Sequence, residues 1–246
     1  MDAQEANARS SRLAILALVV ALIALVVAAI AFIGDDDDEE DAPSTSTTLP
    51  AGTSTTTPSS TTAPAADLSG AVFPDATTSR RFDDPLAATR AFATELLGFN
   101  APLVGEFAAG DSRSGEVEVR GFEGGRPTTV LVRQLENDTW FVLGAIAESI
   151  RLDVPTARDR MASPSDLRGA ASAFEGHVVV HLFADGVAEP IGVSYVTGRG
   201  DGELGDFEGS ISFDVPDGVT DGVLVLFEPS ARDGSTVAAT VIRVHF

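Results

Sequence analysis

The sequence predicts a mostly β protein that is attached to a membrane by one N-terminal helix. Three observations support this fold class: a 21-residue apolar run near the N-terminus, a Ser/Thr/Pro-rich stretch after it, and many short period-two segments in the second half. In full, we expect an N-terminal transmembrane helix, a disordered stalk, a small α+β domain and a C-terminal seven-stranded β-sandwich.

The apolar run, Leu13 to Ile33, contains no charged residue. As a helix with a rise of about 1.5 Å per residue it would be about 31 Å long, which is close to the hydrocarbon thickness of a bilayer. Arg9 and Arg12 precede the run and an acidic stretch follows it. Because basic flanks stay on the cytoplasmic side, we expect residues 1–12 in the cytoplasm and the rest of the chain outside the cell.

A cleaved signal peptide is the alternative, with Ala29-Ile30-Ala31 as the cleavage site. The apolar run is long for the core of a signal peptide, which has about 7–15 residues, so an uncleaved signal anchor is favoured. Residues 34–79 are then an acidic collar and a Ser/Thr/Pro-rich disordered linker. Such a linker lacks the apolar residues needed for a core. Its composition is typical of O-glycosylated stalks, and a bare spacer remains an equal alternative.

Composition excludes several functions. The chain has 16 basic and 37 acidic residues, for a net charge of −21. Nucleic-acid-binding proteins carry a basic face that neutralises phosphates, so no nucleic-acid partner is expected. The chain has no cysteine, which excludes disulfides, thiol nucleophiles and cysteine-ligated zinc.

Residues 80–148 are predicted to form the small α+β domain. Asp84 followed by Pro85 is a helix start, and apolar residues every four positions predict a helix over residues 85–97. Three strand-like segments follow, and Trp140 is expected in the core of this domain. The three predicted strands are residues 116–120, 128–135 and 139–145.

Residues 149–246 show short period-two segments separated by turn residues, with no helix signal. Seven strands in such a length are typical of an immunoglobulin-like β-sandwich, which without cysteines must be held by packing alone. The predicted strands are Ile150–Val154, Leu167–Phe174, His177–Phe183, Ile191–Thr197, Phe207–Val215, Gly222–Phe227 and Val237–Phe246.

Two of the three histidines, His177 and His181, lie on one of these predicted strands. Side chains alternate along a strand, so Val178, Val180 and Leu182 should point into the core and the histidines outward. At about 3.3 Å per residue the two histidines are about 13 Å apart. They cannot bind one metal ion directly, because each ligand lies only about 2 Å from the ion.

Other polar residues give weaker signals. Asp201, Glu203 and Asp206 could meet a calcium ion, but a plain mobile loop is favoured. Glu175 is expected to accept backbone N–H bonds from a neighbouring loop. None of the three histidines adjoins a nucleophile motif such as Gly-x-Ser-x-Gly. We therefore expect no enzyme, no catalytic or metal-binding residue and no cofactor.

Short motifs in a fixed order carry a family resemblance across residues 150–246. They are Pro155, Ser163-Pro164, Gly169-Ala170-Ala171, Phe174-Glu175-Gly176, Gly205-Asp206-Phe207, Gly222-Val223-Leu224, Glu228-Pro229-Ser230 and Asp233-Gly234-Ser235. This segment resembles the GerM-associated immunoglobulin-like domain of bacterial spore germination proteins. The resemblance implies an all-β, non-enzymatic domain at the cell surface and brings no catalytic residues. Residues 80–148 are similar to the region ahead of this domain in membrane-anchored actinobacterial proteins.

The expected function is that of a single-pass membrane protein that displays this domain for cell-envelope binding or scaffolding. A link to sporulation or germination is left open. The expected partners are the membrane, through one helix, and either a wall polymer or another surface protein; no ligand-binding residue is singled out. The alternative is a sensory or regulatory ectodomain that acts on a membrane partner.

Overall fold

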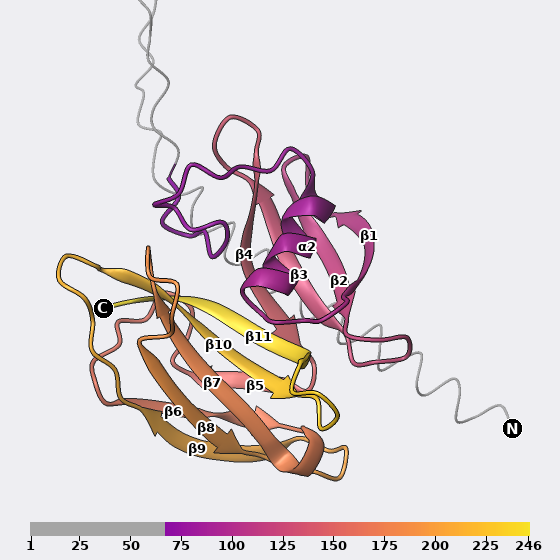
Figure 1. Cartoon of the computed structure of the whole chain (residues 1–246), viewed down its shortest axis with the longest axis vertical. Coiled ribbons are helices and arrows are strands. Elements are labelled where there is room, and N and C mark those ends of the chain that lie inside the picture. Colours follow the sequence, from indigo (N-terminus) through magenta and orange to yellow (C-terminus); the bar gives the residue numbers. More distant parts are fainter. Residues whose placement is uncertain (1–66) are drawn as a thin grey trace, which may run out of the picture. The chain divides into compact units, whose positions relative to one another are not determined.

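The computed structural model describes residues 67–246, which form a mostly β structure with one α-helix, as predicted (Figure 1). The helix is α2, Pro85–Glu95. The strands are β1 Leu103–Ala109, β2 Ser114–Arg120, β3 Thr128–Gln134, β4 Trp140–Ala147, β5 Ile150–Val154, β6 Ser165–Ala171, β7 His177–Ala184, β8 Gly192–Thr197, β9 Gly205–Ile211, β10 Asp221–Pro229 and β11 Thr236–His245.

All strands belong to one antiparallel sheet. Its main path runs β1-β2-β3-β4-β11-β10-β7-β8, while β5 pairs with both β4 and β6, and β6 pairs with β9. The path therefore divides at β4, which is hydrogen-bonded to β3, β11 and β5.

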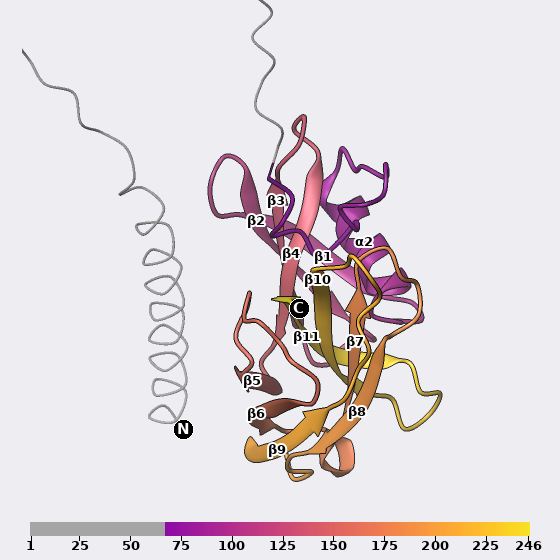
Figure 2. The ribbon, with the colours of Figure 1, turned by 90° about the vertical axis from the view of Figure 1, so that its left-hand side faces the viewer.

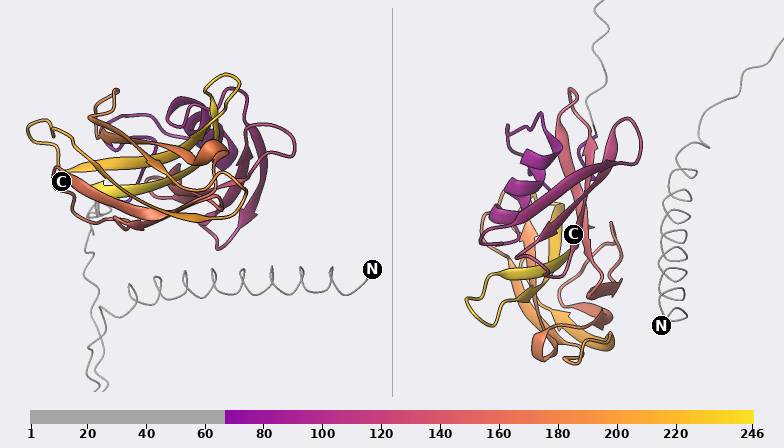
Figure 3. Two further views of the ribbon diagram at one scale, coloured as in Figure 1. Left: turned by 90° about the horizontal axis from the view of Figure 1, so that it is seen from below. Right: turned by 90° about the vertical axis from the view of Figure 1, so that its right-hand side faces the viewer.

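Helix α2 begins where the sequence predicts. The carboxylate of Asp84 accepts hydrogen bonds from the backbone N–H groups of Leu86 and Ala87, and Pro85 occupies the first turn. This cap satisfies backbone donors that have no partner within the helix. Ala88 and Phe92 are fully buried, and α2 packs on β1 to β4 (Figure 3).

Strand β1 is absent from the sequence-based prediction, which has three strands in this region where the structure has four. The register of β1 against β2 shifts between Val104 and Phe107. Such a bulge places an extra residue in the strand and breaks the period of two. The alternation that identifies the other strands is therefore lost in β1.

The seven strands predicted after residue 149 are all present, with ends shifted by a few residues. Strands β5, β6 and β9 face β7, β8, β10 and β11, with an apolar core between the two groups (Figure 2). Val178, Val180 and Leu182 are fully buried in this core, as the alternation predicts. β8 and β9 lie next to each other without pairing as strands, and the hydroxyl of Ser194 on β8 donates to the carbonyl of Ser210 on β9 at 2.7 Å.

The two groups of strands that the sequence assigns to separate domains are joined by backbone hydrogen bonding. β4 pairs with β11 at Ala145 and Val241. The Thr240 hydroxyl donates to the Ile150 carbonyl at 2.6 Å and accepts from the Ala147 N–H at 3.1 Å. The sheet therefore continues from the helix-bearing part into the sandwich.

A second apolar core lies under α2. It contains Phe92 of the helix, Trp140 of β4, and Val225 and Val241 from the outward faces of β10 and β11. Trp140 is 8 % exposed, which confirms its predicted place in a core. Because β10 and β11 contribute to both cores, the second core covers part of the sandwich's outer face and reaches β7 at Phe183.

Residues 67–79, which the sequence places in the linker, lie against the folded part. Ala71 and Val72 are buried, and Phe73 forms an isolated β-bridge with Val142. The bias toward disorder-promoting residues ends before this short apolar stretch. The folded part thus begins earlier than predicted.

The predicted cytoplasmic tail, membrane anchor, acidic collar and Ser/Thr/Pro-rich part of the linker lie outside the residues that the structure describes. Among the residues that it does describe, no helix is long and apolar enough to cross a bilayer.

Candidate functional site

The outward face of β7 and β8 is the candidate binding face. His177, Val179, His181 and Phe183 point outward from β7, and Val193, Tyr195 and Thr197 point outward from β8. Register pairs His177 with Thr197, Val179 with Tyr195, and His181 with Val193. Paired residues on adjacent strands have neighbouring side chains on the same face. The seven side chains therefore form one continuous surface, which we call the β7–β8 face.

This face is exposed at His177 and along β8, whereas Val179, His181 and Phe183 of β7 are half-buried. Tyr195 is 69 % exposed and Val193 is 61 % exposed, the two highest values among the large apolar residues of the described chain. The ring centroids of Tyr195 and His177 lie 5.8 Å apart. Isolated exposed apolar residues are ordinary, but a contiguous group of them marks a contact surface.

Neither β7 nor β8 contains Asp, Glu, Lys or Arg. Among the other strands only β4, which lies inside the sheet, shares this feature. In a chain with a net charge of −21, an uncharged exposed face stands apart from its surroundings. Fully buried interface centres are depleted of charge and enriched in aromatic residues, and the β7–β8 face has that composition.

The two histidines differ in their surroundings. His177 is exposed beside Tyr195, whereas the His181 ring packs edge-on against Phe183 and Phe227, with centroids at 5.9 and 5.1 Å. Burial lowers the pKa of His181, because a low-dielectric environment disfavours the charged ring. The outward direction of both side chains agrees with the prediction from strand alternation.

The side chains of this face are suited to binding by stacking and hydrogen bonding. Tyr195, His177 and Thr197 supply ring surfaces, a phenol, an imidazole and a hydroxyl, which can stack and form hydrogen bonds. Nothing on the face provides a carboxylate for acid–base work. Within residues 67–246, no group of three His, Asp or Glu side chains is arranged to hold a metal ion.

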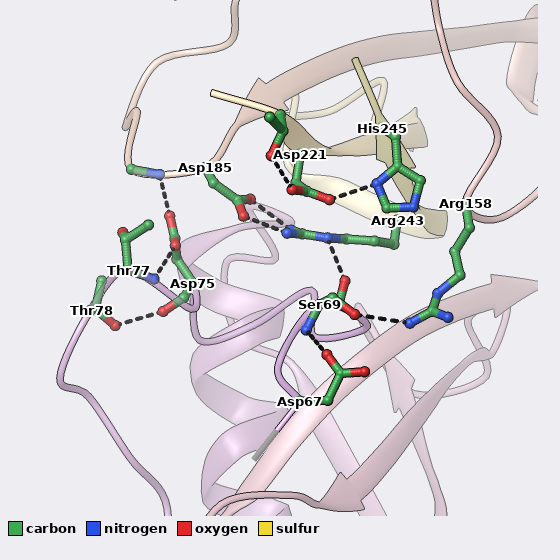
Figure 4. Close-up of polar contacts among 12 residues, drawn as sticks. Asp67, Ser69, Asp75, Thr77, Thr78, Arg158, Asp185, Asp221, Arg243 and His245 are labelled. Atoms are coloured by element: carbon green, nitrogen blue, oxygen red, sulfur yellow. Dashed lines mark hydrogen bonds and ion pairs between the residues drawn. The ribbon is translucent and has the colours of Figure 1, made fainter. Parts of the chain in front are cut away.

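A second polar feature, a buried network centred on Arg243, lies beyond the Phe183 end of the face (Figure 4). Arg243 of β11 is 3 % exposed. Its guanidinium forms a bidentate ion pair with Asp185, with one N–O distance of 2.6 Å. Its Nε donates to the carbonyl of Ser69 at 3.1 Å. Breaking a buried ion pair by removing one partner is costly, so the network fixes these three segments to one another.

Burial and hydrogen bonding shift the pKa values of two carboxylates in and beside the network in opposite directions. Burial raises the pKa of Asp185, and the hydrogen bond and charge of Arg243 oppose that rise. Asp221 lies nearby, and its carboxylate is 2.6 Å from Nδ1 of His245. Burial alone would raise the pKa of Asp221, but hydrogen bonds from Thr220 and His245 outweigh it and the net shift is downward.

An open cleft of about 460 Å³ lies between the N-terminal segment and the sandwich. Its apolar lining includes Phe73 and Leu96 on one side and Phe183 and Val223 on the other. Among its charged side chains, Arg80 is paired with Glu95 and Asp185 with Arg243, while Asp75 accepts hydrogen bonds from the backbone N–H groups of Thr77 and Gly186. Each charged side chain that lines the cleft is therefore already bonded within the fold, and none of them marks a site for an ionic ligand.

The hydrogen bonds expected from a neighbouring loop to Glu175 are not seen in the described part of the chain, and a different acid, Glu228, binds a backbone N–H beside it. Glu175 is exposed and has a positive φ of 55° in the tight turn before β7. Glu228 of β10 accepts the backbone N–H of Phe174 at 2.8 Å and is 5 % exposed. Its other oxygen lies 3.7 Å from the guanidinium of Arg126. The single acid that directly follows the apolar run Val223–Phe227 is the sequence signal that could have identified it.

The acidic loop after β8 is held by its own arginine. Arg199 forms ion pairs with Asp201 and, at 3.2 Å, with Glu203. Asp206, the third residue considered for calcium, lies in β9 beyond this loop. The three acids are therefore not brought together around a common point.

The sequence alone singles out neither Tyr195 nor Arg243. Tyr195 becomes notable only when register places it beside His177 and Val193. Arg243 lies among apolar residues at the end of β11, and a charge within a buried strand indicates a paired partner. The partner, Asp185, lies 58 residues away, too far for any local pattern.

Comparison with known proteins identifies the C-terminal part of the chain. No curated protein and no solved structure matches it. Residues 149–235 match the family model described as the immunoglobulin-like domain of bacterial spore germination. A match to an immunoglobulin-like domain family supports a non-enzymatic role for this segment. The match confirms the resemblance predicted from the motifs after residue 150: this segment, which contains the whole β7–β8 face, is similar to the immunoglobulin-like domains of bacterial spore germination.

Proposed function

We propose that this protein is a membrane-anchored, non-enzymatic surface protein whose immunoglobulin-like part binds an uncharged polymer of the cell envelope. The observation that carries the proposal is the exposed, charge-free β7–β8 face with Tyr195 and His177 side by side. The membrane anchor is the predicted helix over residues 13–33, and the stalk after it provides reach.

Charge favours an uncharged partner. The chain carries an excess of 21 negative charges, and surface charges of one sign repel a polymer of the same sign. The β7–β8 face offers no cation to attract an anionic polymer. It offers rings with polar edges, which can lie against the flat faces of sugar rings while hydrogen-bonding to their hydroxyls.

The shape of the face also favours a polymer over a small ligand. Small molecules bind in concave pockets that enclose most of their surface. The outward residues of β7 and β8 lie on an open strand pair, so a small ligand would stay mostly in water. A chain-like partner can instead make repeated contacts along the 8-residue strand β7.

Co-sedimentation of residues 67–246 with isolated cell walls tests the proposal. The walls are used before and after protease digestion, and the variant Tyr195→Ala is compared with Leu103→Ala. Leu103 is also an exposed apolar residue, at 49 %, but lies on β1 away from the face. We expect wild type and Leu103→Ala to pellet with both wall preparations, and Tyr195→Ala to lose about tenfold in affinity, as for the loss of a contact worth about 1.4 kcal/mol.

Pelleting that disappears after protease digestion would replace the polymer with a protein partner. Pelleting that Tyr195→Ala leaves unchanged would show that the β7–β8 face is not the contact surface.

A further inference from the structure

The N-terminal segment Asp67 to Thr78, which we call the strap, contacts parts of the fold that are distant in sequence. The N–H of Val72 donates to the Val142 carbonyl of β4 at 2.8 Å, and Val142 donates back to the Phe73 carbonyl at 2.6 Å. Ser69 accepts from Arg243 of β11, and the carboxylate of Asp75 accepts from the N–H of a residue in the β7–β8 turn. The strap is therefore bonded at three places.

Arg243 binds the strap and the end of β7 with one side chain. Its two terminal nitrogens hold Asp185, immediately after β7, while its Nε holds the carbonyl of Ser69 (Figure 4). The hydroxyl of Ser69 also accepts from Arg158 at 3.3 Å. If the strap left, the Nε of a side chain that is 3 % exposed would lose its partner. An unsatisfied buried donor is unfavourable, so strap and β7 are coupled through this arginine.

Asp75 provides the second link between strap and hairpin. One of its carboxylate oxygens accepts from the N–H of Gly186, and the other accepts from the N–H of Thr77 at 2.8 Å. Gly186 has a positive φ of 75°, a conformation that glycine adopts without strain. Bonds to a charged acceptor are stronger than neutral ones, so Asp75 fixes the β7–β8 turn as well as its own loop.

The strap also meets the row of side chains that forms the β7–β8 face. Phe183, the last outward residue of β7, lines the same cleft as Phe73 and Pro74 of the strap. The strap thus borders the face at the end where β7 turns toward β8.

We propose that the strap is a latch that holds the β7–β8 hairpin in order. Docked, it holds Asp185 and Gly186 through Arg243 and Asp75 and keeps the hairpin ordered. Detached, it leaves the hairpin turn with fewer bonds and the face less ordered. The structural coupling stands independently of the proposed function, whereas its effect on binding rests on that function.

Amide hydrogen exchange of residues 67–246 tests the latch, because it reports local opening at each backbone N–H. Asp75→Asn weakens the link at the turn, and Arg243→Lys keeps the charge but removes the fork that binds Asp185 and Ser69. The matched control is Arg151→Lys, which keeps the charge but removes the fork of an exposed ion pair with Asp153 on β5.

We expect Asp75→Asn to raise exchange about tenfold at Val187, whose N–H is bonded to the carbonyl of Ala184 and not to Asp75, as well as at strap residue Val72. Arg243→Lys should raise exchange at the same two amides, and Arg151→Lys at neither. Exchange that rises in the strap while Val187 is unchanged would overturn the proposal. If Arg243→Lys does not fold, Asp75→Asn alone decides between these outcomes.

Wall pelleting of the wild type, set beside the exchange result, separates this proposal from the proposed function. Coupled exchange with no wall binding by wild type would leave the latch standing and remove the function. If the wild type binds walls but exchange in the strap and at Val187 is not coupled, the proposed function stands and the latch is wrong.

Discussion

Single side chains determine how this protein combines an acidic surface with an uncharged face. Tyr195 and His177 can be exposed together because their register partners, Val179 and Thr197, carry no charge. Asp185, the first residue after β7, is neutralised by its ion pair with Arg243. The face therefore stays neutral although both strands belong to a strongly acidic chain.

Asp221 makes the stability of the fold depend on pH in a direction that can be stated. Burial pushes its pKa up, but hydrogen bonds from Thr220 and His245 and the charge of Arg243 bring the pKa below its ordinary value. A carboxyl with a lowered folded pKa stabilises the fold above its unfolded pKa, and this stabilisation is lost as pH falls through the folded pKa.

We therefore predict that Asp221→Asn lowers the free energy of unfolding by about 1 kcal/mol at pH 7, from the loss of charge-assisted hydrogen bonds. The difference from wild type should shrink as the pH falls below about 4, the ordinary pKa of aspartate. Thermal unfolding at several pH values measures this difference. Asp214→Asn, at an exposed position, is the control. A difference that stays constant into acid would contradict the assignment.

At the scale of elements, the junction between β4, β5 and β11 joins the helix-bearing part to the sandwich. Few backbone pairs connect these strands: Ala145 with Val241, and Ala147 with Ile150. The buried hydroxyl of Thr240 on β11 forms hydrogen bonds to the backbone of both β4 and β5. These two bonds add to the few backbone pairs that connect the three strands.

Replacement of Thr240 by valine should destabilise the protein by about 1–3 kcal/mol, because it leaves the Ile150 carbonyl and the Ala147 N–H buried without partners. Urea denaturation measures the loss. Thr129→Val on β3 is the matched control, since that hydroxyl makes no side-chain hydrogen bond within residues 67–246. Equal stabilities for the two variants would mean that the hydroxyl does not support the junction.

The elements also show what local sequence can predict. Alternation with a period of two and turn residues such as Asp233-Gly234 identify all seven strands after residue 149, because each signal lies within one strand or turn. Strand β1 is not predicted, because its bulge breaks the alternation of side chains. Helix α2 is found because its cap and its apolar spacing are both local.

At the scale of the whole molecule, the contacts that sequence could not predict are those between distant segments. The pairing of β4 with β11 joins Ala145 to Val241. The network around Arg243 brings Ser69 and Asp185 together from separate parts of the chain. The outward direction of the histidines can be predicted from sequence. That they share a face with Tyr195 depends on the register of β7 against β8, which the sequence does not reveal.

The three histidines offer a direct test of where the envelope polymer binds. His177 and His181 lie on the β7–β8 face, while His245 lies on β11 and is bonded to Asp221. Each ring gives its own NMR signals, so the protein contains two probes on the face and one control outside it.

The measurement is a titration of residues 67–246 with soluble wall fragments free of protein, followed through the three histidine ring signals. The account predicts concentration-dependent shifts for His177 and His181 and an unchanged signal for His245. Shifts confined to His245, or no shift of any ring in a preparation whose parent walls bind the protein, would contradict the assignment of the β7–β8 face.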